Sequence, residues 1–97
     1  MHYFNEIKKN LSEGQTIKNW TILKGYFGED FDIVQISDNR ITVNPFSASL
    51  RTVTAKDFIK IAEIWDDYLT MKIRRKNIMT LTHNSKYVIS ILHHVYK

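Results

Sequence analysis

The spacing of hydrophobic side chains changes along the chain and predicts a helix first and strands afterwards. In residues 2–12, apolar side chains stand at Phe4, Ile7 and Leu11, and this spacing predicts a short amphipathic helix. Residues 16–53 are instead rich in Thr, Val, Ile and aromatic side chains separated by turn residues, which is typical of short strands. The predicted strands lie near residues 17–23, 31–37, 40–44 and 50–53. Because their links are short, we expect an antiparallel meander.

Helical spacing returns after the last predicted strand. Along residues 54–70 the apolar side chains recur on one face of a helix. Thr54 followed by Asp57 resembles a capping box at the first turn of this helix. Trp65 stands in the middle of the apolar face, so we expect it to be buried in the core.

The last part of the chain predicts two further elements. Residues 74–81 fit a short helix or an extended link, and a final helix begins at Asn84 or Ser85 and ends near residue 96. The apolar stripe of that helix is formed by Val88, Ile91, Leu92 and Val95. The side chains expected on its opposite side are Lys86, Ser90, His93 and Lys97. These elements predict a single α+β domain over residues 1–97, with an N-terminal helix, a small antiparallel β-meander and a C-terminal helical section.

The composition excludes several kinds of chemistry and location. The 97-residue chain has no cysteine, which excludes disulfides, thiolate catalysis and cysteine-ligated zinc. It also lacks the apolar run of roughly 20 residues that spans a bilayer, and its first residues do not resemble a secretory signal. We therefore expect a cytoplasmic protein without membrane contact. Because a chain this short buries little surface alone, a homodimer is a natural way to bury more.

Charge is distributed unevenly along the sequence. Residues 1–70 carry eight Lys and Arg against ten Asp and Glu, whereas residues 71–97 carry six basic side chains and no acid. Such asymmetry indicates an anionic partner for the C-terminal part, and nucleic acid is the common candidate because clustered Lys and Arg neutralise phosphates. A solvated basic face that serves only solubility is the alternative.

The basic segment between two predicted helices is the candidate nucleic-acid site. There it could bind a phosphate backbone while the last helix lies in a groove of the nucleic acid, much as in a helix-turn-helix protein. The turn is longer than in that motif and lacks its glycine. The residues expected to bind nucleic acid are Lys72, Arg74, Arg75, Lys76, Lys86, Ser90 and His93. In the alternative, the segment is a solvated turn whose arginines pair with Asp66 or Asp67.

Neither the histidines nor the acids predict a metal site or an enzyme. His93 and His94 are adjacent, so on a helix they point about 100° apart and cannot chelate one ion. The neighbouring acids at residues 29–32 and 66–67 are typical of a solvated turn and a solvated helix end. Since no nucleophile, base and stabilising group can be named together, we expect no catalysis, no metal and no cofactor.

Two aromatic residues between glycines form the remaining motif. In the segment Gly25-Tyr26-Phe27-Gly28, the aromatic rings could stack on a base or another ligand. Burial needs no ligand, however, and aromatic side chains more often close a loop over a small core. The sequence therefore favours a loop that covers the core.

The second half of the chain resembles a known small module. Over residues 31–95 it has a hairpin, a helix with a tryptophan in its middle, a basic turn and a helix capped by serine. The residues that carry the resemblance are Trp65, Tyr68, Arg74, Asn84, Ser85 and Tyr87. The module recurs in bacterial defence-associated and nuclease-linked proteins and in free-standing proteins of mobile gene cassettes, such as those of integrons. The resemblance implies an accessory module whose nuclease residues would lie in a partner domain.

Taken together, the sequence predicts a non-enzymatic binding module of the cytoplasm. Nucleic acid is the favoured partner because of the basic C-terminal region. The alternative is a protein-interaction or self-associating module, encoded on a mobile gene cassette, that binds through a sheet edge or an aromatic patch.

Overall fold

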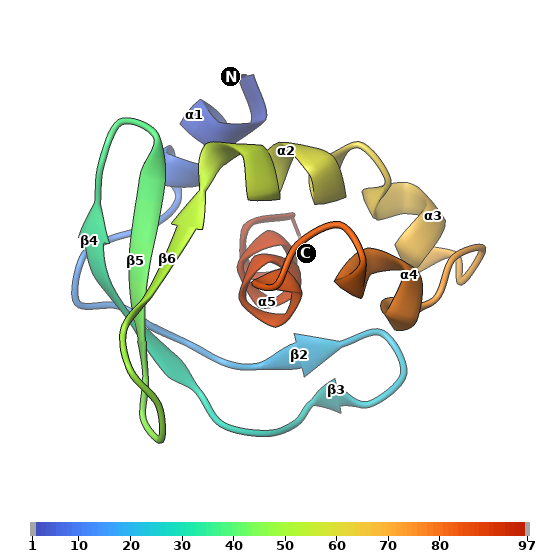
Figure 1. The fold of residues 1–97 in the computed structure, drawn as a ribbon, viewed down its shortest axis with the longest axis horizontal. Coiled ribbons are helices and arrows are strands. Elements are labelled where there is room, and N and C mark those ends of the chain that lie inside the picture. The colour runs from blue at the N-terminus through green and yellow to red at the C-terminus, as the bar shows by residue number, and fades with distance from the viewer. Residues whose placement is uncertain (1, 97) are drawn as a thin grey trace.

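Two antiparallel sheets and four helices surround one further helix, α5, in residues 2–96, which the computed structural model describes (Figure 1). The larger sheet has the strand order β1-β4-β5-β6, and the smaller one pairs β2 with β3. The strands are β1 (Thr16–Ile17), β2 (Trp20–Thr21), β3 (Gly25–Tyr26), β4 (Phe31–Ile36), β5 (Arg40–Pro45) and β6 (Arg51–Thr54). The helices are α1 (His2–Lys9), α2 (Ala55–Ala62), α3 (Trp65–Leu69), α4 (Arg75–Met79) and α5 (Ser85–Tyr96). The α+β class, with its N-terminal helix and C-terminal helices, is confirmed, and none of these helices is long and apolar enough to cross a membrane.

The hairpin of β4 and β5 forms as the sequence predicts. Ile36 pairs with Ile41, and the Ser37 N–H donates to the Arg40 carbonyl at 2.9 Å, so the chain reverses at residues 38–39. Alternate side chains of β5 point into the core, and Ile41 and Val43 are fully buried. The alternation of apolar and polar residues therefore fixes which face of this hairpin is covered.

The helix predicted over residues 54–70 is two helices, α2 and α3. The Ile64 N–H donates to the Ile61 carbonyl, three residues back, and Ile64 leaves the helical region with φ −114° and ψ 14°. After this break, Trp65 packs against Trp20 of β2, with ring centroids 6.3 Å apart, and against Tyr68, at 5.5 Å. Trp65 is buried as predicted, and it joins α3 to the smaller sheet.

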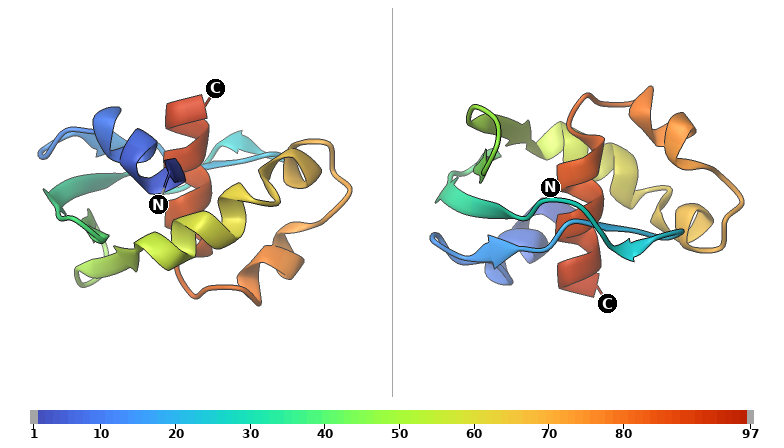
Figure 2. Two further views of the ribbon diagram at one scale, coloured as in Figure 1. Left: turned by 90° about the horizontal axis from the view of Figure 1, so that it is seen from above. Right: turned by 90° about the horizontal axis from the view of Figure 1, so that it is seen from below.

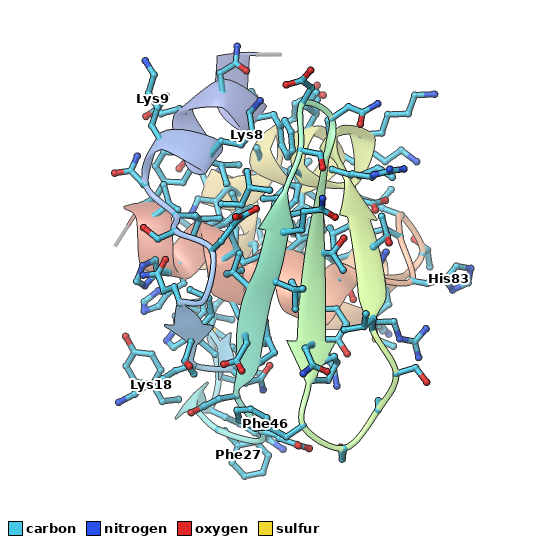
Figure 3. The ribbon with its side chains drawn as sticks, turned by 90° about the vertical axis from the view of Figure 1, so that its left-hand side faces the viewer. Lys8, Lys9, Lys18, Phe27, Phe46 and His83 are labelled. Carbon is cyan, nitrogen blue, oxygen red and sulfur yellow. The ribbon has the colours of Figure 1, made fainter. Side chains whose placement is uncertain are left out.

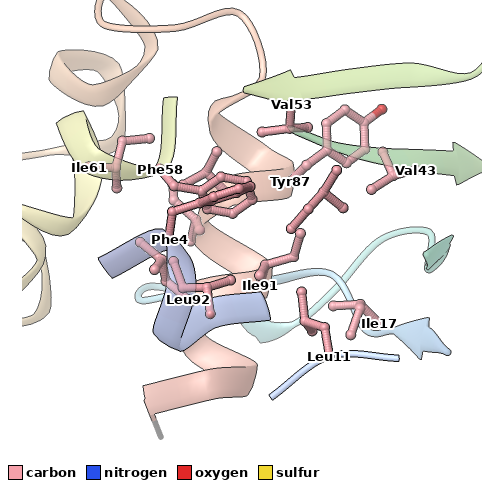
Figure 4. Close-up of a cluster of buried hydrophobic side chains, with 14 of the residues drawn as sticks. Phe4, Leu11, Ile17, Val43, Val53, Phe58, Ile61, Tyr87, Ile91 and Leu92 are labelled. Atoms are coloured by element: carbon pink, nitrogen blue, oxygen red, sulfur yellow. The ribbon is translucent and has the colours of Figure 1, made fainter. Parts of the chain in front are cut away.

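The last helix is the centre of the molecule. Figures 1 and 2 show α5 in red between the larger sheet, α1 and α2 and the β2–β3 hairpin. The predicted apolar stripe does face the core, with Val88, Ile91 and Leu92 fully buried and Val95 partly buried, but other elements cover further sides of the helix as well. Its buried residues are Ser85, Tyr87, Val88, Ile89, Ser90, Ile91 and Leu92. In Figure 4 the side chains of Phe4, Phe58, Val43 and Val53 gather around Tyr87, Ile91 and Leu92.

A capping box at the start of α2 links that helix to α5. The Thr54 N–H donates to Asp57 Oδ2 at 3.0 Å, and the Asp57 N–H donates to Thr54 Oγ1 at 3.3 Å. Asn84, just before α5, donates from Nδ2 to the Thr52 carbonyl at 3.1 Å and to Asp57 Oδ2 at 3.4 Å. Burial alone would raise the pKa of Asp57, but hydrogen bonds from the Thr54 backbone and from the Thr82, Asn84 and Thr54 side chains outweigh it, so the pKa lies below 3.8.

We expect Trp65→Ala to destabilise the fold strongly. The substitution leaves a cavity between α3 and β2, and such truncations cost about 3–5 kcal/mol of the free energy of unfolding. Leu69→Ala on the same helix is the control, because Leu69 is 38% exposed. Urea denaturation measures both variants. Equal, small losses would contradict the structural role of Trp65.

The cap at Asp57 predicts a pH dependence of stability. Because its pKa is lowered in the folded state, the carboxylate stabilises the fold above its unfolded pKa, and this contribution is lost as pH falls through the folded pKa. Asp57→Asn should therefore cost about 1 kcal/mol at pH 7, a typical value for a cap. The difference from the parent should shrink below pH of about 4. Urea denaturation at pH 7, 5 and 3 checks this, with Asp38→Asn in an exposed turn as the control.

Candidate nucleic-acid interface

A groove of about 770 Å³ lies between the β2–β3 hairpin and the segment that joins α3 to α4. This volume is within the range of about 300–1,000 Å³ that is usual for binding pockets. Residues of the hairpin and its flanks form one wall, and residues 71 and 73–76 form the other. Segments about fifty residues apart in the sequence therefore meet at one site.

The walls of the groove carry basic side chains. Four of the residues predicted to bind nucleic acid line it, namely Arg74, Arg75, Lys76 and Lys86. Lys24 from the hairpin adds a fifth basic side chain. Among the described residues that line the groove, Glu29 is the only acid, and its carboxylate accepts a hydrogen bond from the Ser47 hydroxyl at 2.5 Å. The groove is therefore electropositive, and its geometry suits an anion.

A tight reversal after α3 places the arginines at the groove. Met71 adopts a left-handed conformation with φ 63°, and the Lys72 N–H donates back to the Asp67 carbonyl at 2.9 Å. The side chain of Ile73 packs against the core, and the fully buried Ile78 anchors α4. The basic residues thus follow a turn that is fixed at both ends. Lys72 lies on this turn and is exposed, but it does not line the groove.

The arginines are not neutralised by the nearby acids. No ion pair joins Arg74 or Arg75 to Asp66 or Asp67 within residues 2–96. The Arg75 Nε is buried and has no hydrogen-bond partner among these residues. In the described part of the chain, the arginines of this turn therefore do not pair with these two carboxylates in the way that the alternative supposed.

The opposite wall presents Phe27 on a loop fixed by Asn19. The Phe27 N–H donates to the Asn19 carbonyl at 3.0 Å, and Asn19 Nδ2 donates to the Phe27 carbonyl. The Phe27 side chain is 59% exposed, and Lys24 Nζ lies 4.6 Å from its ring centroid. The expectation that this loop covers the core is wrong, because both of its aromatic rings face solvent: Tyr26 is 55% exposed, and Phe27 lines the groove. From the sequence, neither Lys24 nor Asn19 was expected at the site. Lys24 stands next to the aromatic Gly25–Gly28 segment, and this neighbouring positive charge could have indicated a binding loop.

Two residues expected on the binding face of the last helix lie elsewhere. Ser90 is only 1% exposed; its hydroxyl accepts from the Trp20 N–H at 3.0 Å and donates to Asn19 Oδ1 at 3.3 Å. His93 stacks on Trp20, with centroids 3.8 Å apart, beside a separate pocket of about 250 Å³. The predictions that Ser90 faces solvent and that α5 enters a groove of nucleic acid are both wrong, since β2 covers this side of the helix.

The acids and histidines of residues 2–96 form no cluster of three or more that could hold a metal ion. Comparison of the sequence with protein-family models gives no match. No curated protein matches it, and no solved structure does either. A function is therefore inferred from the groove and its charges.

Gly28 allows the Asn19–Phe27 contact, and we expect Gly28→Ala to disturb it. Gly28 and Gly14 have φ +88° and +87°, so alanine is strained at either position by about 1–2 kcal/mol. At Gly28 the new Cβ would also lie 2.9 Å from Asn19 Nδ2, whereas at Gly14 nothing lies within 4 Å. Moving Asn19 breaks its hydrogen bonds, so Gly28→Ala should cost about 1 kcal/mol more than Gly14→Ala in urea denaturation. Equal losses would show that the contact is unimportant.

Proposed function

We propose that the protein is a non-enzymatic nucleic-acid-binding module and that the groove is its binding site. The observation that carries this proposal is the set of five basic side chains on both walls of one groove, against a single acid. Lys and Arg that converge on one cleft focus a positive potential and attract polyanions. The two arginines can each bind a phosphate through two parallel N–H···O bonds.

We propose that the protein binds nucleic acid without cleaving it. The groove holds one carboxylate, from Glu29, and no histidine, serine or cysteine among its lining residues. The two hydroxyl groups of the lining, on Thr21 and Tyr68, accept hydrogen bonds from the Lys24 and Ile22 N–H groups. Neither is paired with Glu29 among the described residues, so the lining offers phosphate ligands but no paired nucleophile and base. The resemblance to accessory modules of nuclease-linked bacterial proteins supports the same reading, with cytoplasmic nucleic acid as the partner and any cleavage performed by another protein or domain.

A protein-interaction or self-associating module is the second candidate. It is favoured by apolar side chains in the same groove, because Leu23 is 74% exposed and Met71 57% exposed. Exposed apolar groups of this kind are typical of protein contact sites. Binding to such a partner would depend little on salt, whereas binding to phosphates depends on it steeply.

Replacing both arginines of the groove tests the proposed function. Arg74→Gln with Arg75→Gln should weaken binding to a labelled oligonucleotide for every sequence alike and lower the slope of log K against log salt by about 1.5–2. The matched control is Arg40→Gln with Arg51→Gln, which removes two exposed arginines from the larger sheet. Fluorescence anisotropy at salt concentrations from about 50 to about 200 mM measures both the affinity and its salt slope.

Two outcomes of the binding experiment would contradict the proposal. One is that neither duplex nor single-stranded nucleic acid binds at low salt. The other is that both double variants lose affinity equally, which would mean that total charge and not the groove determines binding. Elution of the protein as a dimer, together with the first outcome, would favour self-association. The oligonucleotide recovered after incubation with Mg²⁺ should be intact, and cleavage would contradict the absence of turnover.

A further inference from the structure

We infer that the groove takes unpaired nucleotides, with a base stacked on Phe27 and the adjoining phosphates bound by Arg74 and Arg75. This inference rests on the proposed function and adds the class of nucleic acid. It follows from the shape of the groove, from the way Phe27 is held and from the charge over one face of its ring.

The position of the basic residues favours a single strand over a duplex. They line a concave groove of about 770 Å³, which has room for a few nucleotides but not for a double helix. Proteins that bind a duplex usually insert an exposed helix or ribbon into one of its grooves. Here α5 is buried along most of its length, and α4, which carries the arginines, has only five residues. A flexible single strand can follow a concave surface with its phosphates on one wall and its bases on the other.

Phe27 is suited to stacking because its backbone is fixed while its ring is exposed. Asn19 binds both the N–H and the carbonyl of Phe27, and Ser90 in the buried helix donates to Asn19 Oδ1 at 3.3 Å. In Figure 3 the Phe27 side chain projects at the end of the molecule away from Lys8 and Lys9. Because the backbone of Phe27 is already fixed, less conformational entropy is lost when a base stacks on its ring, so binding is stronger. Asn19 and Ser90 are thus positioning residues for Phe27.

A positive charge lies over one face of this ring, so a base would stack on the opposite face. Lys24 Nζ is 4.6 Å from the Phe27 centroid, and both side chains line the groove. A base stacked on Phe27 would bring its own phosphate within reach of Lys24 and the arginines opposite. Aromatic stacking combined with a basic channel is how single strands are bound without regard to sequence. An apolar protein segment would use the ring but leave these charges unpaired.

Anisotropy with two probes of equal length, a labelled oligo(dT) and a duplex, tests the inference. The parent protein should bind oligo(dT) more tightly, and Phe27→Ala should weaken that binding by roughly tenfold, as loss of one stacked base does. Phe27→Tyr should retain the affinity, because it keeps an aromatic ring, and Phe27→Leu should not. Phe46→Ala is the matched control, since Phe46 is 60% exposed and does not line the groove.

The outcomes separate this inference from the proposed function. If single strand and duplex bind equally, or if Phe27→Leu binds like the parent, stacking is overturned while phosphate binding by the arginines stands. If neither probe binds at low salt, the proposed function fails and the inference fails with it. Tighter binding of poly(glutamate) than of oligo(dT) would overturn the choice of nucleic acid and point to an acidic protein partner. Circular dichroism of each variant verifies that it is folded.

Discussion

Burial of α5 on several sides is the constraint on which the rest of the structure depends. The helix gives the larger sheet, α1, α2 and the β2–β3 hairpin a common surface, and each of them contributes fully or partly buried side chains to the cluster around it. In so small a protein one helix cannot also offer a long outer face to a partner. We therefore expect a binding site where other elements extend beyond α5 and leave a groove between them.

The candidate groove occupies such a space, and both of its walls are anchored to the core. Asn19 reaches the core through Ser90, and the opposite wall is held by Ile73 and Ile78. The binding groups are thus placed by rigid parts of the fold, although they lie on a turn and a loop. The groove combines rigid positions with long, adaptable Lys and Arg side chains, which suits a ligand whose charges repeat but whose sequence varies.

What the sequence predicted correctly was local. The Thr54–Asp57 cap, the reversal at residues 38–39 and the amphipathic α1 each depend on residues a few positions apart. The basic segment at the groove was also evident from composition alone. Chemistry of this local kind can be recognised without a fold.

The features that the sequence did not predict depend on contacts between segments far apart in the chain. Lys86, Ser90 and His93 share one face of the last helix, as their spacing indicates, but β2 lies along that face. Ser90 is therefore buried, and only Lys86, at the first turn, reaches the groove. The break at Ile64 could not be predicted, because the helical spacing of apolar side chains continues across it. The exposure of Phe27 depends on Asn19, eight residues earlier, which binds its backbone and holds the loop at the groove. Hydrophobic periodicity cannot show which of two surfaces a neighbour will cover.

The place of α5 in the chain has a consequence for biosynthesis. The ribosome releases every strand, and the helices α1 to α4, before it releases this helix. Until then Phe4, Phe58 and Val53 lack the α5 surface against which they are finally buried, because Figure 4 shows them gathered around side chains of that helix. Until residues 85–96 emerge, the nascent chain therefore exposes the apolar side chains that α5 later covers, and chaperones matter most in that interval. Closure of the core then waits for one segment, α5.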